Sequence, residues 1–424
     1  TLLTHLLHVS YGQALTDLYG DWQYRGLDIP NDLTDITANI TNETESGFVT
    51  FSAVENFSGQ VPVGQAIAGN MILASPNVLN LQATGETLRV EFFFNAAADT
   101  LVGVPRGENN DNLPTVLLKE PTTGTVSGVY SSSWNLIEFR TATTLEVLNG
   151  FITDFDGGDS EYFLGSLDIN GSGGLTLTIN DPEGAINLSG SVTAGASPGV
   201  LTITLNGLPG SLSPAINEAR DVMAMLSPED IGLFIFVREP SSLSLADMAG
   251  FWYFASVEVP TDFNDNGAGQ EFGRQFGLVQ LASDGSFSGT VDGGGVESGG
   301  AFSIGSNPGE VLITAPGEDP LTVFVNESKN FFVGIEEDND SIELVMGVKG
   351  GSDVSFGNFL SNRFNLTISE DNGTVTVNWA ETAGRTLQEF GPSDTQWSDV
   401  STSGGEYTVN LPDDESVMLR VKED

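Results

Sequence analysis

Short acidic segments carry the residues of this chain that could do chemistry, and that chemistry would be calcium binding. Asp262, Asn264 and Asn266 stand at alternate positions before a glycine, with Glu271 beyond them. Hard cations take several oxygen ligands from one short loop, and this spacing is typical of an EF-hand-type loop. The segment departs from that pattern at Gly273, which occupies the twelfth position in place of a bidentate Glu. The four oxygen-bearing residues are predicted calcium ligands, with a solvated acidic loop as the alternative.

A second acidic segment supports the same prediction. Asp154, Asp156, Asp159 and Glu161 place four carboxylates within eight residues. Such a density of oxygen ligands favours a second Ca²⁺ site, again with a solvated loop as the alternative. The acidic run 336–340 is interpreted as a solvated hairpin tip. Calcium is therefore the one cofactor that the sequence indicates.

Residues for nucleophilic or thiolate chemistry are scarce. Histidine occurs only as His5 and His8, and cysteine is absent. A Ser-His-Asp site would have to recruit the N-terminal segment, and a thiolate metal site is excluded. Phosphate-binding glycine loops are missing. The acids are numerous enough for a two-carboxylate glycosidase, but they lie in predicted turns without distinctive pairing. The sequence predicts a protein that is not an enzyme.

Tryptophans could stack on sugars if they were exposed. The chain has five of them, at positions 22, 134, 252, 379 and 397. All five lie in predicted strands, where a large aromatic side chain usually plugs a core. They are therefore expected to be buried, although glycans remain a candidate partner.

The charge balance narrows the class of partner. The chain has 58 acidic and 14 basic residues, for a formal net charge of −44. Such a surface repels nucleic acid and anionic lipid, because binding phosphate needs Lys and Arg. It suits either bound cations or solubility in saline water, and both interpretations stay open. No apolar run reaches about 18 residues, so no membrane-spanning helix is expected.

The elements that must position these residues repeat along the chain. Asp17–Trp22 returns as Asp247–Trp252, an offset of 230 residues. The Phe-Ser-Gly segment 57–59 returns at 287–289 with the same offset. Recurrence at a fixed period indicates a repeated folding unit.

A diverged copy is expected between these two. An Asn-led turn recurs three times, at Asn95–Asp99, Asn217–Asp221 and Asn326–Asn330, and each is followed by an apolar run. Gly128-Val129-Tyr130 is placed where Gly-x-Trp would open the middle copy. The chain is thus predicted to hold three related repeats of about 110 to 120 residues.

Each repeat is predicted to be built of strands. In the third repeat, eight short segments with strand composition are separated by Gly, Asn and Asp turns, at 252–259, 276–281, 286–290, 301–304, 311–314, 321–325, 331–335 and 342–348. Regular short strands with such turns are typical of an all-β barrel or sandwich. Only the segment 214–226 and the N-terminal segment could hold a short helix.

The predicted fold class is all-β, with three tandem homologous antiparallel β-barrel or sandwich domains and a small C-terminal β-sandwich. The expected boundaries are an N-terminal apolar arm at 1–15, β-domains at 16–122, 123–243 and 244–358, and the C-terminal sandwich at 359–424.

The opening Gly-x-Trp, at Gly20–Trp22 and Gly250–Trp252, with the strand count, resembles the calycin barrels such as lipocalins and avidins. The resemblance implies an up-and-down barrel architecture only.

The last segment, about 362–424, resembles the small fibronectin-III-like sandwich at the C-termini of secreted planctomycete and verrucomicrobial proteins. Its Trp379 strand, Thr386-Leu387-Gln388 strand and Trp397-Ser398-Asp399-Val400 strand follow that pattern, while Met418-Leu419-Arg420 replaces the usual aromatic residue. The resemblance implies a secreted bacterial protein at the cell surface or in a matrix.

The N-terminal segment has its apolar residues at helical spacing, at Leu2, Leu3, Leu6, Leu7 and Val9. It is interpreted either as the end of a secretory signal or as an arm that docks on another copy of the chain.

These features together predict an extracellular structural protein, a subunit of a bacterial surface filament, surface layer or matrix. It would assemble with other copies of itself through its β-domains and the N-terminal arm. The alternatives are a glycan-binding or adhesin module, and a carrier of a small ligand inside hollow barrels.

Overall fold

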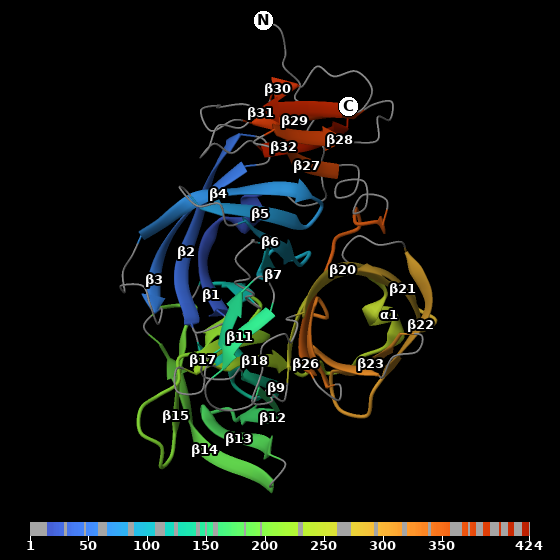
Figure 1. Ribbon diagram of the computed structural model, residues 1–424. Helices are drawn as coiled ribbons and strands as arrows, with labels where there is room; N and C mark the ends of the chain where they lie inside the picture. The colour runs from blue at the N-terminus through green and yellow to red at the C-terminus, as the bar shows by residue number, and fades with distance from the viewer. Residues whose placement is uncertain are drawn as a thin grey trace, which may run out of the picture.

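A computed structural model gives the fold (Figure 1). It describes residues 15–356, apart from 29–31, 46–47, 58–65, 84–88, 107–114, 123–125, 141–144, 149–150, 156–159, 182–183, 196, 228–231, 261–272, 292–295, 316–319 and 338–340, and beyond them the backbones of six strands.

The first repeat is a closed eight-stranded barrel in which each strand pairs with the next and β1 pairs with β8. Its elements are η1 (Leu15–Leu18), β1 (Gly20–Asp28), β2 (Asp32–Glu45), β3 (Phe48–Phe57), β4 (Ala66–Ser75), β5 (Val78–Ala83), β6 (Arg89–Phe94), β7 (Thr100–Arg106) and β8 (Thr115–Lys119).

The middle repeat is an eight-stranded antiparallel sheet that curls back on itself. Its order is β15-β14-β13-β12-β9-β18-β17-β16, and backbone bridges between Ile203 and Leu212 and between Val200 and Ala215 join the two edges. Its elements are η2 (Val126–Val129), β9 (Ser132–Arg140), the hairpin β10 (Leu145–Leu148) and β11 (Phe151–Phe155), β12 (Glu161–Ile169), β13 (Gly174–Asp181), β14 (Gly184–Ala194), β15 (Leu201–Leu205), β16 (Ala215–Ile216), β17 (Val222–Ser227) and β18 (Gly232–Arg238).

The third repeat is again a closed barrel, and Figure 1 shows it end-on with its short helix inside the ring. Its elements are α1 (Leu245–Met248), β19 (Gly250–Pro260), β20 (Gly273–Leu281), β21 (Ser286–Val291), β22 (Glu297–Ile304), β23 (Glu310–Thr314), β24 (Leu321–Val325), β25 (Phe331–Glu337) and β26 (Ser341–Lys349). The eight predicted strands of this repeat are all present.

The C-terminal part consists of two three-stranded antiparallel sheets. One contains β27 (Thr367–Asp371), β28 (Thr374–Asn378) and β31 (Glu406–Asn410), and the other contains β29 (Arg385–Phe390), β30 (Ser398–Asp399) and β32 (Met418–Glu423). The predicted all-β fold class is confirmed, with two closed barrels, a curled eight-stranded sheet between them, and two small sheets at the C-terminal end.

The helix predicted at 214–226 is wrong. Two short strands, β16 and β17, occupy this segment, joined by the turn that Asn217 begins. The side-chain oxygen of Asn217 accepts from the backbone N–H groups of Asp221 and Val222, which fixes a turn where a helix would need those donors for its own ladder.

Each barrel is plugged at one end by a short helical turn and the tryptophan that follows it. Indole Nε1 of Trp22 donates to the carbonyl of Leu18 at 2.9 Å, and that of Trp252 donates to Met248 at 2.8 Å. In the middle repeat Trp134 donates to the Ser132 hydroxyl at 2.7 Å. All three indoles are fully buried, so the prediction that they are core residues is confirmed for these three.

Steric constraints explain why glycine occupies the first position of Gly-x-Trp. Gly20 and Gly250 have φ values of 137° and 132°, a region that side chains rarely adopt. A Cβ on Gly250 would also lie 3.0 Å from the Lys349 side chain. The middle repeat lacks this glycine, and its tryptophan is Trp134, so the predicted match of Gly128–Tyr130 to Gly-x-Trp is wrong.

A fourth core lies between the barrels. Strands that face solvent alternate buried and exposed residues, whereas β9, β18, β25 and β26 are largely buried on both faces. Their inward side chains fill each barrel, and their outward ones form one continuous cluster that includes Val116, Ile235, Tyr253 and Leu344. Burial on both faces explains why these strands are near-continuous apolar runs in the sequence.

The three barrels are arranged in a ring with approximate threefold symmetry. The first strand of each repeat packs on the seventh strand of the next: β1 on β17, β9 on β25, and β19 on β7. The last of these contacts returns from the third repeat to the first, so the ring is closed.

Candidate functional site

The most developed polar site in the described structure is the set of three Asn-led turns where the barrels meet. We call it the asparagine hub: Asn95 and Asp99, Asn217 and Asp221, and Asn326 and Asn330. Each turn joins the sixth and seventh strands of its repeat, or their equivalents in the middle sheet.

Within a turn, one asparagine side chain holds the backbone. The side-chain oxygen of Asn326 accepts from the backbone N–H of Asn330 and of Phe331, both at 3.0 Å. Its amide donates to the side chain of Asn330 at 2.8 Å. The fourth residue of each turn, Ala98, Arg220 or Lys329, has a left-handed φ between 52° and 60°. The first asparagine of each turn is completely buried.

Between turns, the same amides cross to the preceding repeat. Asn217 Nδ2 donates to the Thr100 hydroxyl at 3.2 Å and lies 3.4 Å from the Asp99 carboxylate. Asn326 Nδ2 donates to the Asp221 carboxylate at 3.0 Å. The backbone N–H of Ser328 donates to the same Asp221 oxygen at 2.9 Å. One asparagine therefore both shapes its own turn and fastens the preceding barrel.

The third side of the hub uses the backbone. The N–H of Ala96 donates to the carbonyl of Lys349 at 3.0 Å, which joins the first turn to the end of the third barrel. All three sides of the ring are therefore fastened near its centre.

Ion pairs surround the hub. Arg238, which ends the middle repeat, lies 3.0 Å from Glu327 in the third turn. Its counterpart Lys119 lies 3.8 Å from Glu218 in the second turn. The symmetric partner of Lys349 would stand at position 96, which is an exposed alanine. The acidic partners are largely exposed, so each pair contributes at most about 1 kcal/mol.

A second set of contacts links two of the three first strands to a proline turn of the next repeat. The residue after the barrel tryptophan makes this contact. Tyr253 donates its hydroxyl to the carbonyl of Pro76 at 2.6 Å. Asn135 donates its amide to the carbonyl of Pro308 at 2.8 Å. The equivalent residue in the first repeat, Gln23, is also buried.

The hub carboxylates are suited to holding structure. Burial raises the pKa of Asp99, hydrogen bonds from Asn95 oppose this, and the charge of Asp221 raises the pKa further. Both oxygens of Asp221 accept N–H donors. Three N–H donors thus occupy most of the acceptor positions of the Asp221 carboxylate, which suits the hub to holding the turns together.

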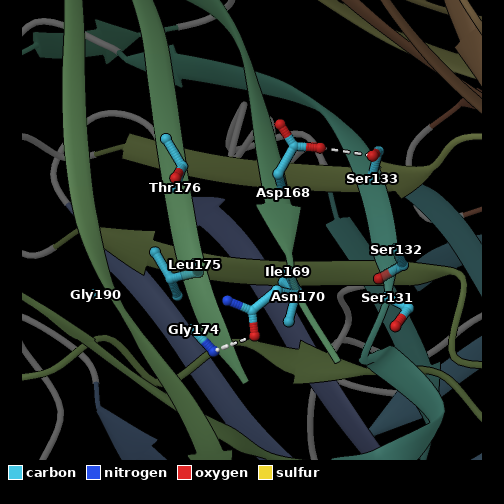
Figure 2. A pocket seen from close by; sticks show the side chains of 10 residues that line it. All are labelled: Ser131, Ser132, Ser133, Asp168, Ile169, Asn170, Gly174, Leu175, Thr176 and Gly190. Atoms are coloured by element: carbon cyan, nitrogen blue, oxygen red, sulfur yellow. Dashed lines mark hydrogen bonds between the residues drawn. The ribbon is translucent and has the colours of Figure 1, made fainter. Parts of the chain in front are cut away.

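A shallow open depression of about 310 Å³ lies on the outer wall of the middle barrel (Figure 2). Ser133 on β9 donates its hydroxyl to Asp168 on β12 at 2.5 Å. Asn170 accepts from the backbone N–H of Gly174 at 3.0 Å. Burial, and then the charge of Asp168, raises the pKa of nearby Glu239. The polar lining could bind a hydroxylated ligand, with carboxylates as acceptors.

The sequence-predicted calcium ligands lie mostly outside the described residues. This holds for Asp262, Asn264, Asn266 and Glu271, and for Asp156 and Asp159. The backbone of Asp154 lies in β11 opposite Glu146, and Glu161 is an exposed residue at the start of β12. Residues 1–14, with the apolar positions of the predicted arm, also lie outside, as do Trp379 and Trp397. What the sequence predicts for these residues stays a prediction.

The described residues contain no group of three or more acidic, His or Cys side chains arranged to hold a metal. The helices in this part of the chain are too short and not apolar enough to cross a membrane.

The hub was visible in the sequence as a repeated pattern, but its role was not. The recurrence of Asn at the first position and Asp or Asn at the fifth identified three equivalent turns. Their meeting at one point depends on how the barrels pack, which spacing alone does not specify.

Comparison with known proteins adds little. No protein-family model and no curated protein matches the chain. Among solved structures, transferrin binding protein B from Neisseria meningitidis serogroup B is matched at 9% identity over 78% of this chain and 76% of that one, with a TM-score of 0.20. A double mutant of transferrin binding protein B from Haemophilus parasuis gives 10% identity, 78% and 75% coverage and a TM-score of 0.20. Superpositions this poor carry no argument about function, which is therefore argued from the side chains.

Proposed function

We propose that this chain is a non-enzymatic extracellular structural protein, a subunit of a bacterial surface filament, surface layer or matrix. In this role the three barrels act as one rigid block. The parts that flank the block, the N-terminal segment and the C-terminal sandwich, supply contacts to other copies.

The observation that carries the proposal is the closed ring of barrels around a shared core. The described inward side chains pack into a core inside each barrel, with Trp22 and Phe92 in the first and Trp252 and Phe302 in the third. The outward apolar faces are buried against one another. The residues that recur between repeats are scaffold residues, which is expected of a building element.

A carrier barrel needs a cavity for its ligand, whereas the described inward side chains of the three barrels pack against one another. The hub adds support for rigidity, since it ties the three turns together with buried hydrogen bonds.

Negative-stain electron microscopy and light scattering of the purified full-length protein test the proposal. We expect ordered assemblies or discrete oligomers, and loss of them when residues 1–14 are deleted. The matched control is the full-length Asp284→Asn variant, which alters an exposed turn of one barrel and should assemble normally. A wild-type protein that stays monomeric at all concentrations, with and without Ca²⁺, would refute it.

Glycan binding is the second candidate, and the depression beside Asp168 favours it. A glycan array with the wild-type protein and the Asp168→Ala variant tests it. Binding that the variant loses supports an adhesin, whereas an array without hits removes this candidate.

A further inference from the structure

One end of the third barrel is acidic inside. On β19 the inward-facing Phe254 packs in the barrel core, and the next two inward positions are Ser256 and Glu258. On β26 the inward position beyond Val345 is Glu343. The opposite end of this barrel, where β19 begins, is the one plugged by α1.

The two glutamates face each other directly. Glu258 is paired with Glu343 in the register of β19 and β26, and Glu336 is paired with Glu343 on the other side. Directly opposed like charges on neighbouring strands destabilise a sheet. Burial raises the pKa of Glu343, and the charge of Glu258 raises it further, against a lowering effect of Ser256.

Two serine hydroxyls accompany the carboxylates. Ser341 donates to Glu258 at 2.7 Å. Ser256 is 1% exposed, and its hydroxyl makes no well-formed hydrogen bond although it lies beside Glu343. A buried hydroxyl without such a partner is destabilising, so a cation that binds its oxygen would be stabilising.

In the middle barrel, an arginine side chain neutralises the carboxylate at the equivalent end of the interior. Counted from the barrel tryptophans, Arg140 corresponds to Glu258 and Glu138 corresponds to Ser256. Glu138 is fully buried there and pairs with Arg140. Within the described residues, no Lys or Arg pairs with Glu258 or Glu343. The third barrel therefore has two partly buried carboxylates at the point where the middle barrel has an internal ion pair.

We propose that this end of the third barrel binds a hard divalent cation, Ca²⁺, through the carboxylates of Glu258 and Glu343 and the hydroxyls of Ser256 and Ser341. The ligand set consists of oxygen alone, which suits Ca²⁺ and excludes thiophilic metals. Both glutamates are partly exposed, so water completes the coordination shell. Glu336 adds negative charge beside the site.

The test uses the full-length protein. Calorimetric titration with CaCl₂ and thermal unfolding in EDTA or in CaCl₂ should show binding and a higher Tm with Ca²⁺. Glu343→Gln should weaken this affinity at least about tenfold, because the site loses one of its two charged ligands. Glu337→Gln, on the outer face of the neighbouring strand, is the matched control and should bind as the wild type does.

Glu258→Arg imitates the middle barrel and separates the site from a folding defect. This variant should have a higher Tm than the wild type in EDTA and no Ca²⁺-dependent gain at this site. An Asp262→Asn variant tests in parallel whether the acidic segment 262–271 binds the Ca²⁺ instead. The proposal is overturned if Ca²⁺ does not bind, or if Asp262→Asn abolishes the response while Glu343→Gln leaves it unchanged. It is also overturned if the Tm difference between the wild type and Glu343→Gln changes with pH but not with Ca²⁺.

Discussion

The Tyr253 hydroxyl donates to the carbonyl of Pro76, 177 residues earlier in the chain, at 2.6 Å. Its ring stacks on Phe93, with ring centroids 5.0 Å apart and planes inclined by 8°. One residue of the third barrel thus supplies both a buried hydrogen bond and an aromatic contact to the first barrel. This is one of the contacts that close the ring.

Tyr253→Phe should lower the free energy of unfolding by about 1 to 2 kcal/mol, because the Pro76 carbonyl loses its buried donor. Tyr162→Phe is the matched control, since Tyr162 also reaches the third barrel, at Glu337, but in an exposed pair. Its cost should stay below about 1 kcal/mol. Urea denaturation measures both, and equal losses would contradict this assignment.

Asp221→Asn should be more damaging. Both oxygens of Asp221 accept N–H donors, so an amide in its place would direct its own N–H groups at other donors. We expect a loss of about 3 kcal/mol, as when a buried hydrogen-bonded charge is removed. Asp284→Asn, in an exposed turn, should change stability little. A small effect at both positions in urea denaturation would contradict the hub's role.

Ala96→Glu should stabilise the protein slightly. It would give Lys349 the acidic partner that Arg238 and Lys119 already have. The expected gain is up to about 0.5 kcal/mol at low ionic strength, and it should fall as salt screens the pair. Ala97→Glu, at the neighbouring exposed position, is the control. Thermal unfolding at two salt concentrations checks this, and a gain independent of salt would contradict it.

Acidification from neutral pH should stabilise the protein in EDTA. The pKa of Glu343 in the folded state lies above its ordinary 4.5, so the folded state binds this proton more tightly than the unfolded state does. Stability therefore rises as pH falls through the folded pKa and is lost as pH rises again. The measurement is made at high salt, which screens the repulsion among the protein's negative charges.

Glu343→Gln should flatten that pH dependence, and Glu337→Gln should leave it unchanged. Urea denaturation at several pH values between neutral and about 5 measures the slope. A variant slope equal to that of the wild type would show that other groups cause it.

An excised third barrel, residues 244–356, should not behave as a stable monomer. It would expose the outward face of β19, β25 and β26, where Val257, Val333 and Leu344 are buried in the shared core. We expect aggregation or unfolding in light scattering and circular dichroism. Replacing these three residues by threonine should improve solubility. A monomeric, fully folded fragment without those changes would contradict the shared core.

The repeat pattern predicted much of the fold. Trp22 and Trp252 marked equivalent first strands, and alternation placed most strands of the third repeat correctly. The middle repeat was harder, because Ser131 and an extra residue replace the glycine before Trp134. The segment 214–226 was misjudged because its apolar spacing suits a helix, while Asn217 fixes a turn through hydrogen bonds that periodicity does not reveal.

The candidate sites depended on contacts that local spacing does not encode. The cross-links from Asn326 to Asp221 and from Tyr253 to Pro76 join residues more than a hundred positions apart. The pairing of Glu258 with Glu343 follows from barrel closure, since it joins the first strand to the last. Continuous apolar strands were the one sequence signal of the shared core.

The return contact from β19 to β7 also fixes copy number. In an open repeat array, another unit can be added at an end because each unit touches only its neighbours. Here the third barrel already occupies the face of the first that a fourth would need. A duplication of one more repeat would have no place in this ring, so the block can evolve by changing its outer walls and flanking segments but not by lengthening.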